Sequence, residues 1–324
     1  MSAKWKLKFI EYMANKESVR NRAVKKEFKT IMMADPDGKI VESTAWWPNW
    51  MRGLAGVAGF VLEGGGFNQL IVPGSVIAAG NMATIKYKSG NVDIDCVPSY
   101  VPLAIVGVEA KRDSVVITEK GIGGGPDLIR MWTSPAMRRV ERKMNGGGTV
   151  FESEYPIWRK VVIGLDDTDS SVKGATFNTA LQIASILDRG LKDVKFLRLT
   201  LSLNWPKNPA KTTNNASSAL VFAVKPGKEE ELVREFRRLA TKVTISKETG
   251  MTVMTKLQAP ESLRAYAMKV KTVQVDVSEA YKAAEQAGVR TIPITGERGL
   301  IGALSAIGLV DELETAVTPI GNPS

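Results

Sequence analysis

An apolar run that passes directly into an acidic cluster is the feature of this sequence that most constrains its fold. The run is Val161-Val162-Ile163-Gly164-Leu165, and Asp166-Asp167-Thr168-Asp169 follows it. Such a run is typical of a strand buried on both faces, and open α/β sheets bind ligands at the carboxyl ends of such strands. Because side chains alternate along an extended chain, we expect Asp167 and Asp169 on one side and Asp166 on the other.

Predicted helices and strands alternate around this run. The hydrophobic spacing predicts helices over 177–187, 229–239, 278–286 and 301–313, and strands over 196–203, 219–224 and 272–277. Strands that alternate with helices indicate an α/β sandwich. We therefore expect an α/β domain over residues 156–324.

The first half of the chain has a different texture. Residues 1–30 are basic and predict a helix, and short apolar segments separated by Gly, Pro and Asn turns follow them. Residues 126–143 predict a further basic helix. The expected fold class is thus α/β (α+β), with a β-rich, glycine-containing N-terminal domain over residues 1–155 and an α/β domain after it.

Composition excludes several kinds of chemistry. The 324 residues include no histidine and one cysteine, Cys96. An internal disulfide, a zinc site of Cys and His, and histidine acid–base catalysis are therefore excluded within this chain. Carboxylates, Lys, Arg, hydroxyls and backbone groups remain, and these are the materials of phosphoryl transfer.

The charge and hydropathy of the chain bear on its partners. The formal net charge is +10, which fits either a polyanionic partner such as RNA or a solvated basic surface. No apolar run approaches the roughly 18 residues that span a membrane, and the charged N-terminus is unlike a secretory signal. We expect a cytoplasmic protein that does not bind membranes.

The acidic cluster predicts a metal site. Three neighbouring carboxylates, Asp166, Asp167 and Asp169, repel one another, and Mg²⁺ relieves such repulsion while it binds phosphate oxygens. The alternative is a turn, in which Asp and Thr are common. Lys173 and Thr176 follow, just before a predicted helix. Thr176 either caps that helix or lies beside a phosphate at the helix N-terminus, with Lys173 adding positive charge.

Three segments carry a resemblance to a known family. Residues 163–169 resemble the opening of the archaeal agmatine-dependent tRNA(Ile) cytidine (agmatidine) synthetases, and residues 204–216 and 298–308 resemble two later motifs of that family. The resemblance implies an ATP-using, kinase-like domain, in which Thr176 matches a threonine associated with phosphorylation. Those synthetases begin with the acidic motif and contain a zinc ribbon, so we do not expect the chain to be the synthetase itself.

The whole arrangement resembles the methanogenesis marker protein 11 family more closely. Members of that family pair a Gly-rich N-terminal domain with a similar acidic segment, here Asp166-Asp167-Thr168-Asp169 followed by Gly174-Ala175-Thr176-Phe177. The resemblance implies an ATP site and no particular substrate.

The later motifs supply further candidate ligands of a nucleotide. Lys211 is either a phosphate ligand or a solvated lysine, and Asn215 either orients a phosphate or caps a turn. Arg298 pairs with phosphate, with the aspartates, or with a surface acid. Gly299 either admits a nucleotide to the backbone or allows close helix packing.

Two classes of function remain. The first is an enzyme that transfers a phosphoryl or nucleotidyl group from Mg–ATP in a methanogen-specific RNA or protein modification pathway. The second is a binding protein, either a nucleotide-binding assembly factor for a methanogenic enzyme complex or an RNA-binding protein. An oligomer is compatible with both.

Overall fold

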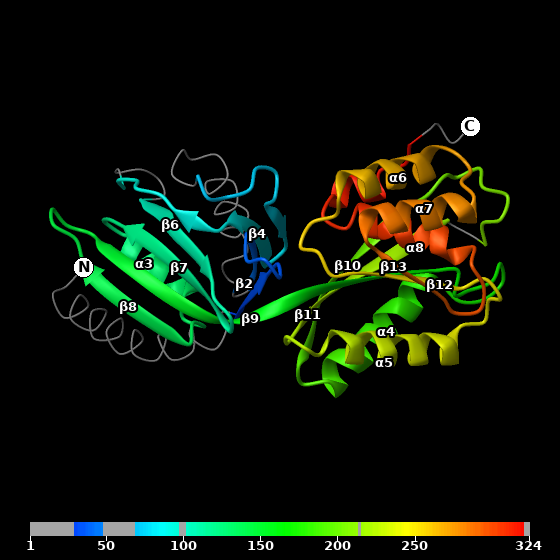
Figure 1. Cartoon of the computed structure of the whole chain (residues 1–324), viewed down its shortest axis with the longest axis horizontal. Coiled ribbons are helices and arrows are strands. Elements are labelled where there is room, and N and C mark those ends of the chain that lie inside the picture. Colours follow the sequence, from blue (N-terminus) through cyan, green and yellow to red (C-terminus); the bar gives the residue numbers. More distant parts are fainter. Residues whose placement is uncertain (1–28, 48–68, 97–101, 213–214, 321–324) are drawn as a thin grey trace, which may run out of the picture. The chain divides into compact units, whose positions relative to one another are not determined.

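The computed structural model describes residues 29–47, 69–96, 102–212 and 215–320, which divide into two compact units (Figure 1). The N-terminal unit is Met1–Ile157 and the C-terminal unit is Trp158–Ser324. This division falls two residues beyond the expected boundary. The basic helix expected over residues 1–30 lies outside the described residues, except that Lys29 already belongs to the first strand.

The N-terminal unit is built on a sheet with the strand order β3-β4-β2-β1-β9-β7-β6-β5, and β8 also pairs with β9. The strands are β1 (Lys29–Ala34), β2 (Ile40–Trp46), β3 (Ile77–Ala79), β4 (Met82–Lys88), β5 (Gly90–Asn91), β6 (Leu103–Ala110), β7 (Ser114–Gly121), β8 (Arg138–Lys143) and β9 (Thr149–Asp166). Helix α3 (Gly125–Trp132) precedes β8. The helix expected over residues 126–143 is therefore wrong in its second half, because β8 pairs antiparallel with β9.

The C-terminal unit is an α/β sandwich, as expected, around an antiparallel sheet in the order β10-β11-β9-β12-β13. Its further strands are β10 (Val194–Leu203), β11 (Ala216–Val224), β12 (Gly250–Met254) and β13 (Arg290–Pro293). Helices α4 (Thr176–Gly190) and α5 (Glu229–Val243) cover one face, and α6 (Glu261–Thr272), α7 (Val277–Ala287) and α8 (Gly299–Gly308) cover the other (Figure 1). The short α9 (Leu313–Val317) follows α8. The strand expected over residues 272–277 is wrong, because α6 ends there and a loop leads into α7.

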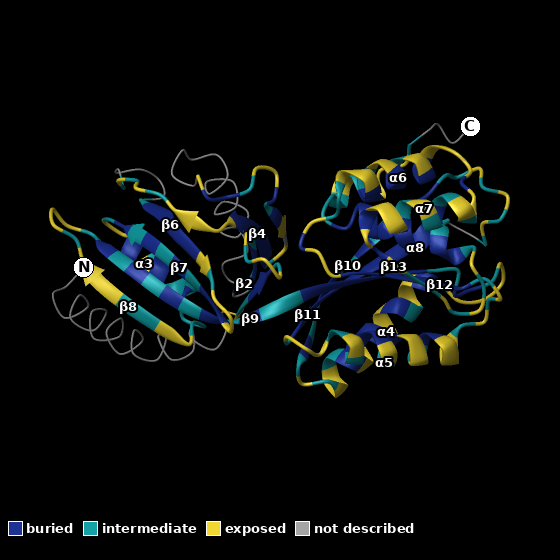
Figure 2. Ribbon diagram, in the orientation of Figure 1, coloured by how far each residue is buried: buried dark blue, intermediate teal, exposed yellow. Residues whose placement is uncertain are grey.

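The end of β9 is the central strand of this sheet. Val161, Val162, Ile163 and Leu165 are fully buried between the two helix layers, whose outer faces are exposed (Figure 2). Gly164 lies under α8, where a Cβ would come 2.1 Å from the carbonyl oxygen of Ala303. The apolar run thus forms the doubly buried strand that it predicts, and its glycine lets α8 approach closely.

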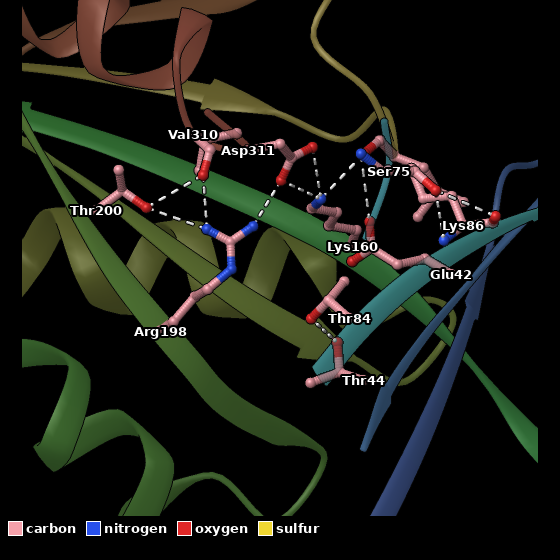
Figure 3. A network of polar contacts seen from close by, with 11 residues as sticks. Glu42, Thr44, Ser75, Thr84, Lys86, Lys160, Arg198, Thr200, Val310 and Asp311 are labelled. Carbon is pink, nitrogen blue, oxygen red and sulfur yellow. Dashed lines mark hydrogen bonds and ion pairs between the residues drawn. The ribbon is translucent and has the colours of Figure 1, made fainter. Parts of the chain in front are cut away.

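A buried ionic network ties β9 and β10 to the segment after α8 (Figure 3). Lys160 Nζ lies 3.3 Å from Asp311 Oδ1 and donates to the carbonyl of Leu257 at 2.9 Å. Arg198 donates to Asp311 at 2.5 Å and to the carbonyl of Val310 at 2.6 Å. Because buried cations are costly without an opposing charge, the shared Asp311 carboxylate stabilises both of them.

Candidate functional site

The acidic loop begins where β9 ends, at Asp166. Asp167 has a left-handed backbone with φ of 54°, a conformation that Asp tolerates better than most residues. The turn interrupts the alternation of an extended strand, so Asp166, Asp167 and Asp169 all line one hollow. The expectation that Asp166 would face the opposite side from the other two is therefore wrong.

Hydrogen bonds from two sides hold this loop. The buried Thr168 donates its amide to Thr176 Oγ1 at 3.1 Å, and its carbonyl accepts from the amide of Ile245 at 3.1 Å. The carbonyl of Asp167 accepts from Thr249 Oγ1 at 2.6 Å. These bonds fix the backbone, so the carboxylates are presented from a rigid turn.

Two hollows meet at the acidic loop. The first, which we name the α4 hollow, has a volume of about 410 Å³ and reaches Thr176 and Phe177 at the start of α4. The second, the α8 hollow, has a volume of about 430 Å³ and lies beside α8. Asp166, Asp167 and Asn215 line both. Because the two hollows share these residues, they form one continuous candidate site.

Burial and mutual repulsion make the first two carboxylates hard to ionise. Burial, and next the neighbouring Asp167 carboxylate, raise the pKa of Asp166 well above its ordinary value. Burial also raises the pKa of Asp167, although the Arg298 guanidinium opposes this shift. Arg298 Nε lies 3.1 Å from Asp167 Oδ2, which is one of the pairings predicted for Arg298.

Polar side chains from the segment before β11 complete the wall. Thr212 donates to Asp169 Oδ1 at 3.2 Å. Asn215 has a left-handed backbone with φ of 48°, and its amide group donates to the carbonyl of Trp205 at 2.6 Å. Asn204 is buried between Ser217 and Ser305, to which it is bonded at 3.2 Å each, and lines the α8 hollow. Thr212 and Asn204 belong to the motif over residues 204–216, but sequence reasoning misses them as site residues because it does not say which polar side chains of a loop turn inward.

Thr176 is at the start of α4 but is not its cap. The N-cap is Ala175, which has no side-chain cap bond, so the amides of the first turn lack the usual side-chain acceptor. Thr176 Oγ1 accepts instead from the amide and hydroxyl of Thr168. The hydroxyl thereby supports the acidic loop, and the helix N-terminus faces the α4 hollow with its positive dipole end.

The structure does not bring three of the predicted residues to this site. Lys173 is exposed, and Lys211 is exposed with its ammonium on the carbonyl of Pro206 at 2.6 Å. Neither lines either hollow. The amide of Gly299 donates to the carbonyl of Glu248, and a Cβ there would lie 2.4 Å from the Gly250 nitrogen. Of the two expectations for Gly299, close packing is therefore the one that the structure supports.

The side chains at this site fit a magnesium ion only if a bound ligand supplies further oxygen atoms to it. Among the described residues, no three acidic or cysteine side chains are gathered to hold an ion by themselves. Mg²⁺ commonly takes one or two carboxylates and completes its shell with water and substrate phosphates. Asp166 and Asp167, which are partly buried and repel each other, suit that arrangement, and the buried Asp169 lines the same hollow. The magnesium site remains a prediction.

The fold and site define a mixed α/β protein with an acidic, helix-flanked pocket at the end of a central strand. No model of a known protein family matches the chain. It is 32% identical to the uncharacterized protein MJ0921 of Methanocaldococcus jannaschii over 237 residues, which are 72% of this chain and 78% of that protein. The chain belongs to the family of MJ0921.

The C-terminal unit has further relatives. The tRNA 2-agmatinylcytidine synthetase TiaS of Pyrococcus horikoshii is 32% identical over 150 residues, 45% of this chain and 35% of TiaS. TiaS of Pyrobaculum neutrophilum is 35% identical over 155 residues, 46% of this chain and 35% of TiaS. The chain thus matches about a third of the length of each TiaS.

Solved structures give a weaker likeness. The crystal structure of TiaS in complex with its tRNA and ATP matches with a TM-score of 0.42 and 26% identity over 46% of this chain and 36% of that chain. The complex of TiaS with tRNA, AMPCPP and agmatine matches with a TM-score of 0.40 and 24% identity over the same shares. The relation to TiaS therefore rests on the sequence matches and not on the structural ones. Membership of the methanogenesis marker protein 11 family remains a prediction.

In the described residues, no helix combines the length and the apolar character required to cross a membrane.

Proposed function

We propose that the C-terminal unit binds Mg–ATP where the α4 and α8 hollows meet. The observation that carries this proposal is the position of Asp166 and Asp167, which line both hollows beside Arg298 and the N-terminus of α4. The sequence relation to TiaS supports it, since TiaS has been crystallised with ATP.

Each part of the pocket has a role in this proposal. Asp166 and Asp167 hold the magnesium ion, which supplies charge neutralisation at the phosphates. The first-turn amides of α4 and the Arg298 guanidinium receive phosphate oxygens. Val270, Val275 and Ile301 give the α8 hollow an apolar wall against which the base packs.

We further propose that the bound ATP donates a phosphoryl or nucleotidyl group to an RNA acceptor. TiaS is named as a tRNA 2-agmatinylcytidine synthetase, and the net charge of +10 suits a polyanionic acceptor. A methanogen-specific pathway and a cytoplasmic location belong to the same proposal. Lys173 and Lys211 are exposed, and in this proposal they contact the acceptor or the phosphates.

Isothermal titration of ATP into the full chain, with and without Mg²⁺, tests the site. Asp167→Asn should abolish Mg²⁺-dependent binding, because it removes a ligand and the partner of Arg298. Asp127→Asn is the matched control, since Asp127 is an exposed acid of α3 that pairs with Arg130. Failure of the wild-type protein to bind Mg–ATP would contradict the proposal.

The products then identify the reaction. ADP release with the γ-phosphoryl group recovered on archaeal tRNA indicates phosphoryl transfer, and pyrophosphate release with AMP joined to the tRNA indicates nucleotidyl transfer. Tight binding of ATP without turnover would instead support the second candidate, a nucleotide-binding assembly factor for a methanogenic enzyme.

A further inference from the structure

The N-terminal unit contains a second cavity that the proposed nucleotide site does not use. It has a volume of about 660 Å³ and is lined from β1, β2, β4, β6, β7, β9 and α3. Four aromatic side chains line it: Trp47, Tyr87, Trp132 and Tyr155. The ring centroids of Trp47 and Trp132 lie 6.1 Å apart. The cavity is therefore an apolar, aromatic chamber that is partly open to solvent.

One acidic side chain enters this chamber. Glu119 lies on β7, two residues after Ile117 on the same face, and is 3% exposed. Its Oε1 accepts from the indole nitrogen of Trp132 at 2.8 Å. Its Oε2 is buried and has no hydrogen-bond partner. Because a buried carboxyl oxygen without a partner is costly and rare in folded proteins, a ligand group that bonds to this oxygen would remove that cost.

The charges around Glu119 favour a cation in the chamber. None of the described residues that line the cavity is a lysine or an arginine. Arg139, on β8, is the cation that faces Glu119, but its guanidinium bonds to the carbonyl of Arg130 at 3.0 Å and to Glu141 at 3.1 Å. Two further titratable neighbours are the phenols of Tyr87 and Tyr155, whose pKa values are both raised mainly by burial and also by the charge of Glu119. No described side chain therefore occupies the free oxygen.

We propose that this cavity binds a small organic cation, a primary ammonium group carried on an apolar body. The ammonium donates to Oε2 of Glu119 and lies among the faces of Trp47, Trp132, Tyr87 and Tyr155, which attract a positive charge. The apolar body fills the chamber against Met32, Ile85 and Ile105. This binding is independent of ATP.

Ionisation of Glu119 is coupled to binding. Burial raises the pKa of Glu119 to about 8, with Trp132 and Arg139 opposing the shift. Without a bound cation the carboxyl is therefore mostly protonated at neutral pH, and the ammonium displaces that proton. Affinity for an amine rises with pH until Glu119 is ionised.

The test uses the full chain and two probes of the same shape, 2-phenylethylamine and 2-phenylethanol. Ligand-observed NMR and titration calorimetry measure both at pH 6.5 and pH 8.5. The amine should bind about tenfold or more tightly than the alcohol, given the strength of charged hydrogen bonds. Its affinity should rise between the two pH values while that of the alcohol does not.

Two variants locate the site. Glu119→Gln keeps the shape and the bond from Trp132, and it should lower the amine affinity about tenfold or more. Glu109→Gln is the control, because Glu109 is an exposed acid of β6 that pairs with Lys111. Equal affinity for amine and alcohol, no binding of the amine, or full amine binding by Glu119→Gln would each overturn the proposal. The pH dependence of the wild-type protein decides the question even if Glu119→Gln does not fold.

Discussion

The carboxylate of Asp166 lies against the first turn of α8, where a Cβ on Gly302 would come 1.8 Å from Asp166 Oδ2. No side chain fits at Gly302 unless the acidic loop or the helix moves. Asp166, a candidate magnesium ligand, can therefore take its position only because residue 302 of α8 has no side chain.

Gly302→Ala should consequently impair both the fold and the site. We expect a loss of about 1–3 kcal/mol in the free energy of unfolding, the usual cost of overpacking, together with weaker Mg–ATP binding. Urea denaturation and calorimetry measure the two effects. Gly190→Ala is the control, because a Cβ there meets nothing within 4 Å. Equal stability of the two variants would show that α8 can shift to accommodate the extra methyl group at no cost.

Arg298 should contribute to nucleotide affinity through its charge and its position beside Asp167. Arg298→Gln should weaken Mg–ATP binding about tenfold or more, as expected for the loss of a charged hydrogen bond. Arg298→Lys should restore part of the affinity. Arg290→Gln provides the comparison, since Arg290 is exposed and pairs with Glu230. If Arg298→Gln binds ATP like the wild type, Arg298 serves only to hold Asp167.

The hydroxyl of Thr176 should stabilise the acidic loop, Asp166–Asp169, independently of any bound nucleotide. Thr176→Ala removes the acceptor of the buried Thr168 amide, so we expect a loss of about 1–3 kcal/mol in the free energy of unfolding. Thr176→Ser keeps the hydroxyl and should retain most of that stability. Mass spectrometry after incubation with Mg–ATP tests whether Thr176 is phosphorylated. Loss of stability in Thr176→Ser equal to that in Thr176→Ala would point to the methyl group instead.

The Asp311 network should be far more sensitive than a surface ion pair. Asp311→Asn leaves Lys160 and Arg198 without their shared carboxylate, and we expect a loss of about 3–5 kcal/mol in stability. Glu230→Gln removes an exposed acid that pairs with Arg290 and should cost about 1 kcal/mol or less. Chemical denaturation measures the free energy of unfolding of both variants. Equal losses in Asp311→Asn and Glu230→Gln would contradict the prediction.

Glu119 should make stability depend on pH in a defined direction. Its folded pKa of about 8 exceeds the ordinary value of 4.5. Its stabilising contribution is therefore complete below pH 4.5 and is lost as the pH rises through about 8. The stability of Glu119→Gln relative to the wild type should increase with pH over that window and then level off. A constant difference between the two proteins would show that Glu119 titrates normally.

Some of this architecture could be predicted from sequence for clear physical reasons. The apolar run is typical of a strand buried on both faces, which it forms, and the acidic residues that follow it line the candidate site. The order and direction of the strands could not be predicted, because apolar runs do not distinguish an antiparallel sheet from a parallel one.

The errors have physical causes as well. Val273, Val275 and Val277 alternate as in a strand, but the preceding residues form α6 and no described neighbour pairs with the segment. Residues 138–143 are charged and suggest a helix, yet pairing with β9 overrides that propensity. The left-handed turn at Asp167 is held by the bond that the distant Thr249 donates to the Asp167 carbonyl and by the bond that the Thr168 amide donates to Thr176.

Strand β9 has a consequence for how this protein can be divided. It runs without a break from Thr149 to Asp166 and pairs with β7 and β8 before the unit boundary and with β11 and β12 after it. A cut at the boundary would fall within one strand and would meet no exposed loop or spacer. Neither unit can therefore be separated at a loop, and a fragment that encodes one unit must include the part of β9 that pairs within it.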